Sequence, residues 1–257
     1  MDVVLIGAGN VGTVLGRTFK QVGHAITAIW NRDSEKAKQL ADELGTVAVE
    51  DLKELPQKAD IFLLAVSDKS IQEVAHQLTI TAGVLVHAAG AVSKEVLQGV
   101  SNDYGVIWPM KMIRSHMSSL GSSAIIIDAN SASALQVIES LAESISRQVS
   151  RADDDKRLQM HLIAAITSNF TNHLYHLASD YAKEKEIDFS LFYPLIEGVI
   201  AQIKVQDPEK AQAGPAFRGD RVTIEKHRSL LADEPVLLKI YDEMTQSILH
   251  NSVISSF

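Results

Sequence analysis

The residues whose spacing best suits chemistry stand at the start of the chain, where three glycines follow the apolar run Val3–Ile6 in the pattern G-x-G-x-x-G. In such a pattern the first glycine permits a tight turn, the second lets a pyrophosphate approach the backbone, and the third lets the next helix pack closely. The N-terminal amides of that helix would hold the phosphates. We expect a bound dinucleotide rather than a glycine-rich turn of unrelated purpose. The residues expected around the phosphates are Gly7, Gly9, Asn10, Val11 and Gly12.

The end of the next predicted strand, Ala25–Trp30, is expected to select the form of the dinucleotide. A carboxylate about 20 residues beyond the glycines binds the ribose 2′-hydroxyl of NAD and repels a 2′-phosphate. Here Asn31 and Arg32 follow the strand, and a guanidinium holds a phosphate through its planar fork of donors. We therefore expect NADP rather than NAD. Two alternatives stay open: Asp33 serves as the NAD carboxylate if the strand ends later, or Arg32 is a solvated turn residue.

Polar residues also follow later predicted strands, at the edge where a doubly wound sheet binds its ligands. Val66, Ser67 and Asp68 end the strand that begins at residue 60 and are expected beside the cofactor, although they also suit an ordinary helix N-cap. His87 ends the next buried run, where it either touches the nicotinamide or substrate or is a buried structural histidine. Lys111 follows another predicted strand and is a candidate for the same cleft.

A long helix, Asp154–Lys185, is predicted to carry a polar stripe along an otherwise apolar surface. Unpaired buried amides cost about 1–3 kcal/mol, so such a stripe needs partners. The partners are either a substrate and the nicotinamide amide or polar groups on neighbouring helices. No metal site is predicted, because two histidines at ligand spacing, 173 and 176, have no clear third ligand. At 100° per residue the shared face carries His161, Ser168, Asn172 and His176, and Asn169 lies beside it.

The elements that position these residues fall into two predicted domains. Strand and helix patterns alternate up to about Ser150, which indicates an α/β domain over residues 1–151, with a Rossmann-type doubly wound sheet. Residues 152–257 are predicted to be all-helical, and no Gly or Pro occurs from Ala152 to Phe192. The helices expected after the long one are Asp188–Val205, Pro208–Ala213, Val222–Leu231 and Pro235–His250.

Composition limits the remaining possibilities. The 257 residues carry 24 basic and 32 acidic side chains, a net charge of −8 that argues against a nucleic-acid surface. The absence of cysteine excludes disulfides, a thiol nucleophile and a cysteine zinc site. No apolar stretch approaches the roughly 18 residues of a membrane span, and no basic segment precedes the first apolar run. We therefore expect a cytoplasmic protein without a membrane or nucleic-acid partner.

Several motifs carry a more specific resemblance. Through them the chain resembles the family of Rossmann-like proteins whose C-terminal half is catalogued as domain of unknown function 2520. The resemblance implies an NADP-type Rossmann domain, a helical domain similar to that of 6-phosphogluconate dehydrogenase, and a homodimer. More distantly the chain is similar to pyrroline-5-carboxylate reductase and to deazaflavin-dependent NADP reductases. The motifs are Ile6–Gly12, Asn31-Arg32, Ala65–Asp68, His87–Ala91, Asn169–His173, Gly214–Asp220 and Ile224–His227.

The resemblance leaves the reaction open. In the related β-hydroxyacid dehydrogenases a helix carries Lys-x-x-Asn as proton donor and orienting amide. The resemblance matches Asn172 to the orienting amide but puts Asn169 in place of the lysine, and an amide cannot supply a proton near pH 7. Either another group is the acid/base, or the reaction needs none, as for an imine that is already protonated. The alternative acid/base candidates are His87, Lys111, His161 and His173.

We therefore expect an NADP-dependent oxidoreductase that transfers a hydride to or from a small polar metabolite bound between the two domains. The alternative is a non-catalytic homodimer that binds or senses a dinucleotide.

Overall fold

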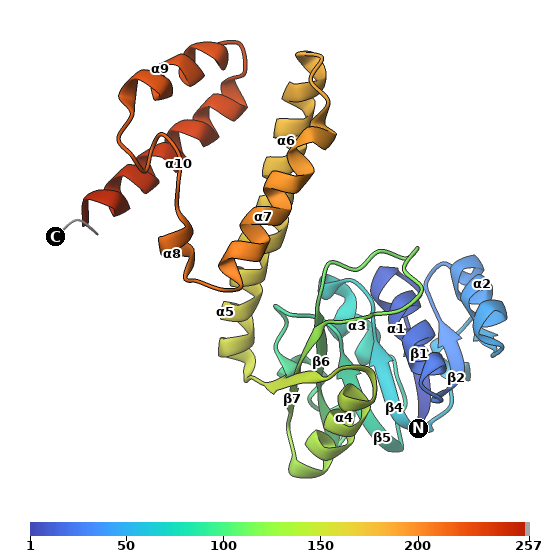
Figure 1. Cartoon of the computed structure of the whole chain (residues 1–257). Coiled ribbons are helices and arrows are strands. Elements are labelled where there is room, and N and C mark those ends of the chain that lie inside the picture. The colour runs from blue at the N-terminus through green and yellow to red at the C-terminus, as the bar shows by residue number, and fades with distance from the viewer. Residues whose placement is uncertain (255–257) are drawn as a thin grey trace. The chain divides into compact units, whose positions relative to one another are not determined.

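The computed structural model describes residues 1–254, which form two compact units that divide between Phe170 and Thr171 (Figure 1). The first unit contains every strand and the start of the long helix. The second unit contains the helices that follow. No helix within residues 1–254 has the length and hydropathy of a membrane span.

The first unit is built on one eight-stranded sheet in the order β3-β2-β1-β4-β5-β6-β7-β8. Neighbouring strands are parallel throughout except for β6 and β7, which are antiparallel. The order confirms the expected doubly wound sheet. The strands are β1 Asp2–Ile6, β2 Ala25–Trp30, β3 Ala48–Val49, β4 Lys58–Leu64, β5 Ala82–His87, β6 Asp103–Met110, β7 Ala124–Ala129 and β8 Gln148–Arg151.

Both faces of this sheet are covered, and that explains the uninterrupted apolar runs in its strands. Val3 and Leu5 pack in one core with helices α1 (Asn10–Gln21), α2 (Ser34–Leu44) and α4 (Ala132–Ile145). Their neighbours Val4 and Ile6 pack in a second core, which includes the short helix α3 (Ile71–Ala75). Successive strand residues point to opposite faces, so each helical layer receives every second side chain.

The long helix differs from the single regular helix predicted for Asp154–Lys185. It consists of α5 (Asp154–Ala164), a π-helical segment (Ala165–Phe170) and α6 (Thr171–Glu184). A π-helical segment has i→i+5 hydrogen bonds and more residues per turn than an α-helix. Residues before and after it therefore do not keep the 100° spacing on which the predicted polar stripe depends.

The rest of the second unit is helical, as expected. The predicted helix Asp188–Val205 begins with a 3₁₀ turn, Phe189–Phe192, which the Asp188 side chain caps at Ser190 N with a 2.9 Å hydrogen bond. Helices α9 and α10 are joined by a 2.9 Å hydrogen bond between His227 Nδ1 and the Tyr241 hydroxyl. The helices are α7 Tyr193–Ile203, α8 Pro208–Ala211, α9 Arg221–Leu230 and α10 Pro235–Ile254.

Candidate functional site

The glycine turn between β1 and α1 has two glycines that the fold requires and one that it does not. Gly7 has φ +114°, and a Cβ there would lie 2.5 Å from the carbonyl oxygen of Ala65. A Cβ at Gly12 would lie 1.9 Å from the carbonyl oxygen of Gly7. A Cβ at Gly9 would meet no other part of the described chain within 4 Å. The open space at Gly9 is therefore available to a ligand that approaches the backbone.

The N-terminus of α1 faces the same space with unpaired amides. Gly9 is the N-cap and supplies no side chain, and the first turn contains no acidic residue. The first amides of a helix have no intrahelical acceptor, and the helix dipole makes them attractive to anions. The turn thus fits the pyrophosphate of a dinucleotide.

A cavity of about 550 Å³ opens beside the turn. Arg32 is exposed there, and its guanidinium makes no hydrogen bond or ion pair with the part of the chain that the structure describes. Asp33 is engaged as the N-cap of α2: its carboxylate accepts from the backbone N–H of Lys36 at 3.4 Å and lies 3.5 Å from the Lys36 ammonium. The lining residues that enter the argument are Gly9, Asn31, Arg32, Asp33, Lys36, Val66 and Ser67.

Two predicted cofactor residues use their side chains to fix the protein around the turn. Asn31 accepts from the N–H of Ala8 at 3.0 Å and donates to the carbonyl of Asp33 at 3.0 Å. Asn10 accepts from the N–H of Ser115 at 2.9 Å. Both side-chain amides are therefore hydrogen-bonded to the protein backbone and fix the conformation of the turn.

Val66 and Ser67 lie where the sequence predicts, at the exit of β4 and on the wall of the cavity. The Ser67 and Ser70 hydroxyls share a 2.7 Å hydrogen bond, and Ser67 makes no side-chain bond to the following 3₁₀ turn, Asp68–Ser70. Asp68 is exposed and is not among the residues that line the cavity.

His87 is completely buried at the end of β5. Its Nδ1 accepts from the N–H of Ala89 at 3.2 Å, which puts the ring proton on Nε2, a buried atom without a hydrogen-bond partner. Burial, followed by the nearby charge of Arg157, lowers the pKa of His87 to about 4. The ring is thus neutral and has the environment of a structural histidine, with no exposed surface for a cofactor.

Lys111 follows β6, and its ammonium donates to the carbonyl of Leu120 at 2.6 Å. This bond closes the loop 111–120, which α1 also holds, since Thr18 Oγ1 accepts from Leu120 N at 2.8 Å. The Lys111 amino group is therefore already engaged as a hydrogen-bond donor.

His161 lies beside the loop that leaves β5. Its ring packs against Trp108 with the centroids 5.6 Å apart, and a Cβ at Gly90 would lie 2.6 Å from both His161 Cδ2 and Trp108 Cε2. Gly90 therefore makes room for the histidine at the end of β5. The imidazole is half-buried, and its sheet edge is the one at which ligands bind in doubly wound folds.

The other predicted catalytic residues are exposed. Asn169 belongs to the π-helical segment in the first unit, whereas Asn172 and His173 belong to α6 in the second unit. The rings of His173 and His176 lie 6.0 Å apart, centroid to centroid. No group of three or more His, Asp or Glu side chains within residues 1–254 is arranged to hold a metal ion.

Sequence reasoning missed three residues of this site: Lys36, Gly90 and Trp108. Lys36 lies in the first turn of α2, four residues after Arg32, where a search for a second cation finds it. Gly90 belongs to the motif His87–Ala91 and Trp108 to a predicted strand, but their contacts with His161 join residues far apart in the sequence.

Comparison with known proteins agrees with this architecture. Residues 1–112 match the model of a Rossmann-like domain, and residues 123–248 match that of domain of unknown function DUF2520. Pyrroline-5-carboxylate reductase from Aquifex aeolicus is 31% identical over 101 residues, which cover 39% of this chain and only 38% of the reductase.

Two solved structures extend the likeness to nearly the whole chain. A proposed NADP oxidoreductase from Bacteroides fragilis has a TM-score of 0.89 and 30% identity, covering 97% of this chain and 98% of that protein. Pyrroline-5-carboxylate reductase from Streptococcus pyogenes has a TM-score of 0.66 and 14% identity over 97% of this chain and 98% of its own, and so shares the fold. The protein thus belongs to the family in which a Rossmann-like domain precedes the domain of unknown function DUF2520.

Proposed function

We propose that the protein is an NADP-dependent oxidoreductase that transfers a hydride to or from a small polar metabolite and acts in the cytoplasm. The observation that carries the proposal is the open space at Gly9, next to the unpaired guanidinium of Arg32 in one cavity. Proteins similar to this chain in sequence or structure are oxidoreductases, which supports the same class of reaction.

The arrangement after β2 favours NADP over NAD. Arg32 offers a planar fork of donors to the 2′-phosphate, and Lys36 adds a second positive charge on the same cavity wall. Asp33, the residue that would bind the 2′-hydroxyl of NAD, is held as the cap of α2. A dianionic phosphate at this position would therefore meet the unpaired guanidinium of Arg32, whereas the Asp33 carboxylate on the same wall is paired with Lys36.

His161 is the group that we assign to proton transfer. An imidazole can donate or accept a proton near neutral pH, which the amides of Asn169 and Asn172 cannot. Its place beside the exit of β5 suits contact with the nicotinamide half of a dinucleotide whose phosphates lie on the α1 N-terminus. The cofactor supplies the hydride, and the protein supplies orientation and the proton.

Calorimetric titration with NADPH and NADH tests the cofactor assignment. Arg32→Ala should weaken NADPH binding on the order of 10- to 100-fold, the effect of removing a charged hydrogen-bond partner, and leave NADH nearly unchanged. Arg147→Ala is the matched control, because Arg147 is also exposed but precedes β8 at the opposite end of the sheet. Equal losses for both dinucleotides would remove Arg32 from this role.

A screen for NADPH oxidation in the presence of candidate carbonyl and imine metabolites then tests the reaction. Turnover that falls in His161→Gln, with NADPH affinity retained, supports the proposal. Tight NADPH binding without turnover on any candidate would instead support the non-catalytic, dinucleotide-sensing alternative.

We also propose that the chain is a homodimer, formed through its helical part. Helix α7 contains no buried residue, although most of its side chains are apolar. Leu195, Val199 and Ile203 recur every four residues and share one exposed face. Contiguous apolar patches of this kind mark protein interfaces, and a second copy brings an equal face.

A further inference from the structure

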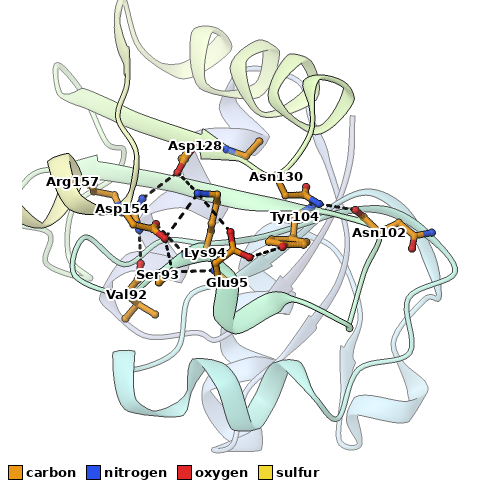
Figure 2. A network of polar contacts seen from close by, with 11 residues as sticks. Val92, Ser93, Lys94, Glu95, Asn102, Tyr104, Asp128, Asn130, Asp154 and Arg157 are labelled. Atoms are coloured by element: carbon orange, nitrogen blue, oxygen red, sulfur yellow. Dashed lines mark hydrogen bonds and ion pairs between the residues drawn. The ribbon is translucent and has the colours of Figure 1, made fainter.

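A cluster of charged side chains around the buried Arg157 links the start of α5 to the sheet (Figure 2). Arg157, in the first turns of that helix, has only 1% of its surface exposed. Its Nη2 donates to the carbonyl of Val92 at 2.5 Å and to Asp154 at 2.6 Å. Its Nη1 lies 3.8 Å from the Asp128 carboxylate on β7. One guanidinium thus joins the helix to the loop after β5 and to β7.

Lys94 completes the cluster from the other side. Its ammonium lies 2.9 Å from Asp128 and 3.9 Å from Asp154, and its backbone N–H donates to Asp154 at 3.1 Å. The Ser93 hydroxyl donates to Asp154 as well. Burial alone would raise the pKa of Asp154, but the hydrogen bonds from Ser93 and Arg157 outweigh it and hold that pKa below its ordinary value. The carboxylate is therefore charged and bound from both segments.

Such a cluster is better explained by geometry than by stability. The desolvation of buried ion pairs offsets much of their attraction, and apolar replacements are often just as stable. Directional hydrogen bonds between a guanidinium and its acceptors, by contrast, fix where the helix lies. Two guanidinium nitrogens of Arg157, Nε and Nη1, are buried without hydrogen bonds. Their lost hydrogen bonds to water are a cost to stability, so the position of Arg157 is better explained by the geometry that it imposes on the helix.

The anchoring of α5 by Arg157 also determines the position of His161. It follows Arg157 by four residues and therefore lies one turn further along the same face of α5. Its ring packs against Trp108 and lies close to the backbone of Gly90, and a rotation or shift of the helix would move it away from both. We infer that Arg157 is a positioning residue, which through Val92, Asp154 and Asp128 holds the His161 imidazole at the exit of β5. The inference rests on the proposed function, in which His161 transfers the proton.

Histidine-selective ¹³C labelling and NMR of the full chain test the inference without a substrate. The chain has nine histidines, and His161→Gln identifies the signal of interest. The Trp108 ring should displace that signal from its free-histidine position, and Trp108→Leu should abolish the displacement. Arg157→Met, which keeps the apolar stem, should remove at least about half of it, while Arg157→Lys, a point charge without the fork, should restore it only partly.

Arg151→Met is the matched control, because Arg151 pairs with Glu139 on the exposed side of β8 at 2.6 Å, outside the cluster. This variant should leave the His161 signal in place. If Arg157→Met does not fold, Asp128→Asn weakens two of the same contacts and should move the signal in the same direction. A folded Arg157→Met or Asp128→Asn protein with an unmoved His161 signal would overturn the inference.

NADPH titration of the same variants separates this inference from the proposed function. Arg157→Met should keep its NADPH affinity within about 2-fold of the wild type, because the cluster lies outside the cavity at Arg32. A wild-type protein that binds no NADPH would defeat the proposed function and still leave the position of His161 measurable.

Discussion

Most apolar residues of the sheet are buried, whereas most of those of helix α7 are exposed to solvent. In β1 the four residues Val3–Ile6 are completely buried between two layers of helices. In α7 the apolar residues Leu195 and Val199 remain 67% and 54% exposed. Burying one such side chain is worth about 1.5–3 kcal/mol, so an apolar helix left in water forgoes much of its stabilisation. The core of the sheet is thus complete within one chain, whereas the exposed apolar face of α7 is the reason why we propose a second copy.

The substitution with the strongest predicted consequence is in α7 and changes the affinity of the dimer. Val199→Asp puts a charge in the middle of the proposed dimer face and should raise the dimer dissociation constant on the order of 1,000-fold. Sedimentation equilibrium measures it. Val47→Asp is the control, because Val47 is similarly exposed, at 59%, but precedes β3 in the sheet unit. An unchanged mass for Val199→Asp, or a monomeric wild type, would contradict the proposed interface.

The dependence of unfolding on protein concentration distinguishes residues buried within one chain from residues buried in a dimer. Leu63→Ala in β4 removes a completely buried side chain and should lower the free energy of unfolding by about 2–5 kcal/mol at every concentration. Leu195→Ala should instead destabilise through dimerisation, so that its effect appears as a concentration-dependent midpoint. Urea unfolding over a 100-fold range of protein concentration, followed by circular dichroism, distinguishes the two. Concentration-independent behaviour of Leu195→Ala would mean that α7 is covered within its own chain.

A smaller effect concerns the histidine buried at the end of the sheet. The unfolded chain binds a proton on His87 near pH 6.5, but the folded protein does so only near pH 4. Its contribution to stability is therefore complete above pH 6.5 and is lost as the pH falls toward 4, a change of about 3 kcal/mol. His87→Leu should lose less stability than the wild type between pH 7.5 and 4.5 in urea unfolding. His116→Leu, at an exposed loop position, is the control and should follow the wild type; parallel wild-type and His87→Leu curves would refute the assignment.

The sequence predicts the sheet unit well because its signals are local. The apolar run Val3–Ile6 and the glycines after it specify strand, turn and helix within a dozen residues, and the structure has them there. Strand β8, Gln148–Arg151, was missed because it is short and largely exposed and so has no apolar run. The π-helical segment Ala165–Phe170 is not predicted, because an extra residue in one helical turn does not require particular amino-acid types.

The candidate site is less predictable where distant residues meet. Gly9 and Arg32 are predicted as cofactor residues from local sequence, and both line one cavity. The burial of His87, by contrast, depends on packing that no local pattern reveals. No local pattern singles out Arg157, since its partners Val92 and Asp128 lie 65 and 29 residues away in the sequence.

The strand order has a consequence for synthesis of the chain. β1 is synthesised before the other seven strands of the sheet but lies inside it, between β2 and β4. One of its edges pairs with Ile61–Leu64, which is made about 60 residues later. At about 5–20 residues per second, this apolar edge waits for several seconds without its partner. A nascent chain that pauses before β4 therefore exposes an unpaired apolar strand edge, which is prone to aggregation. We expect chaperones to matter most during this interval.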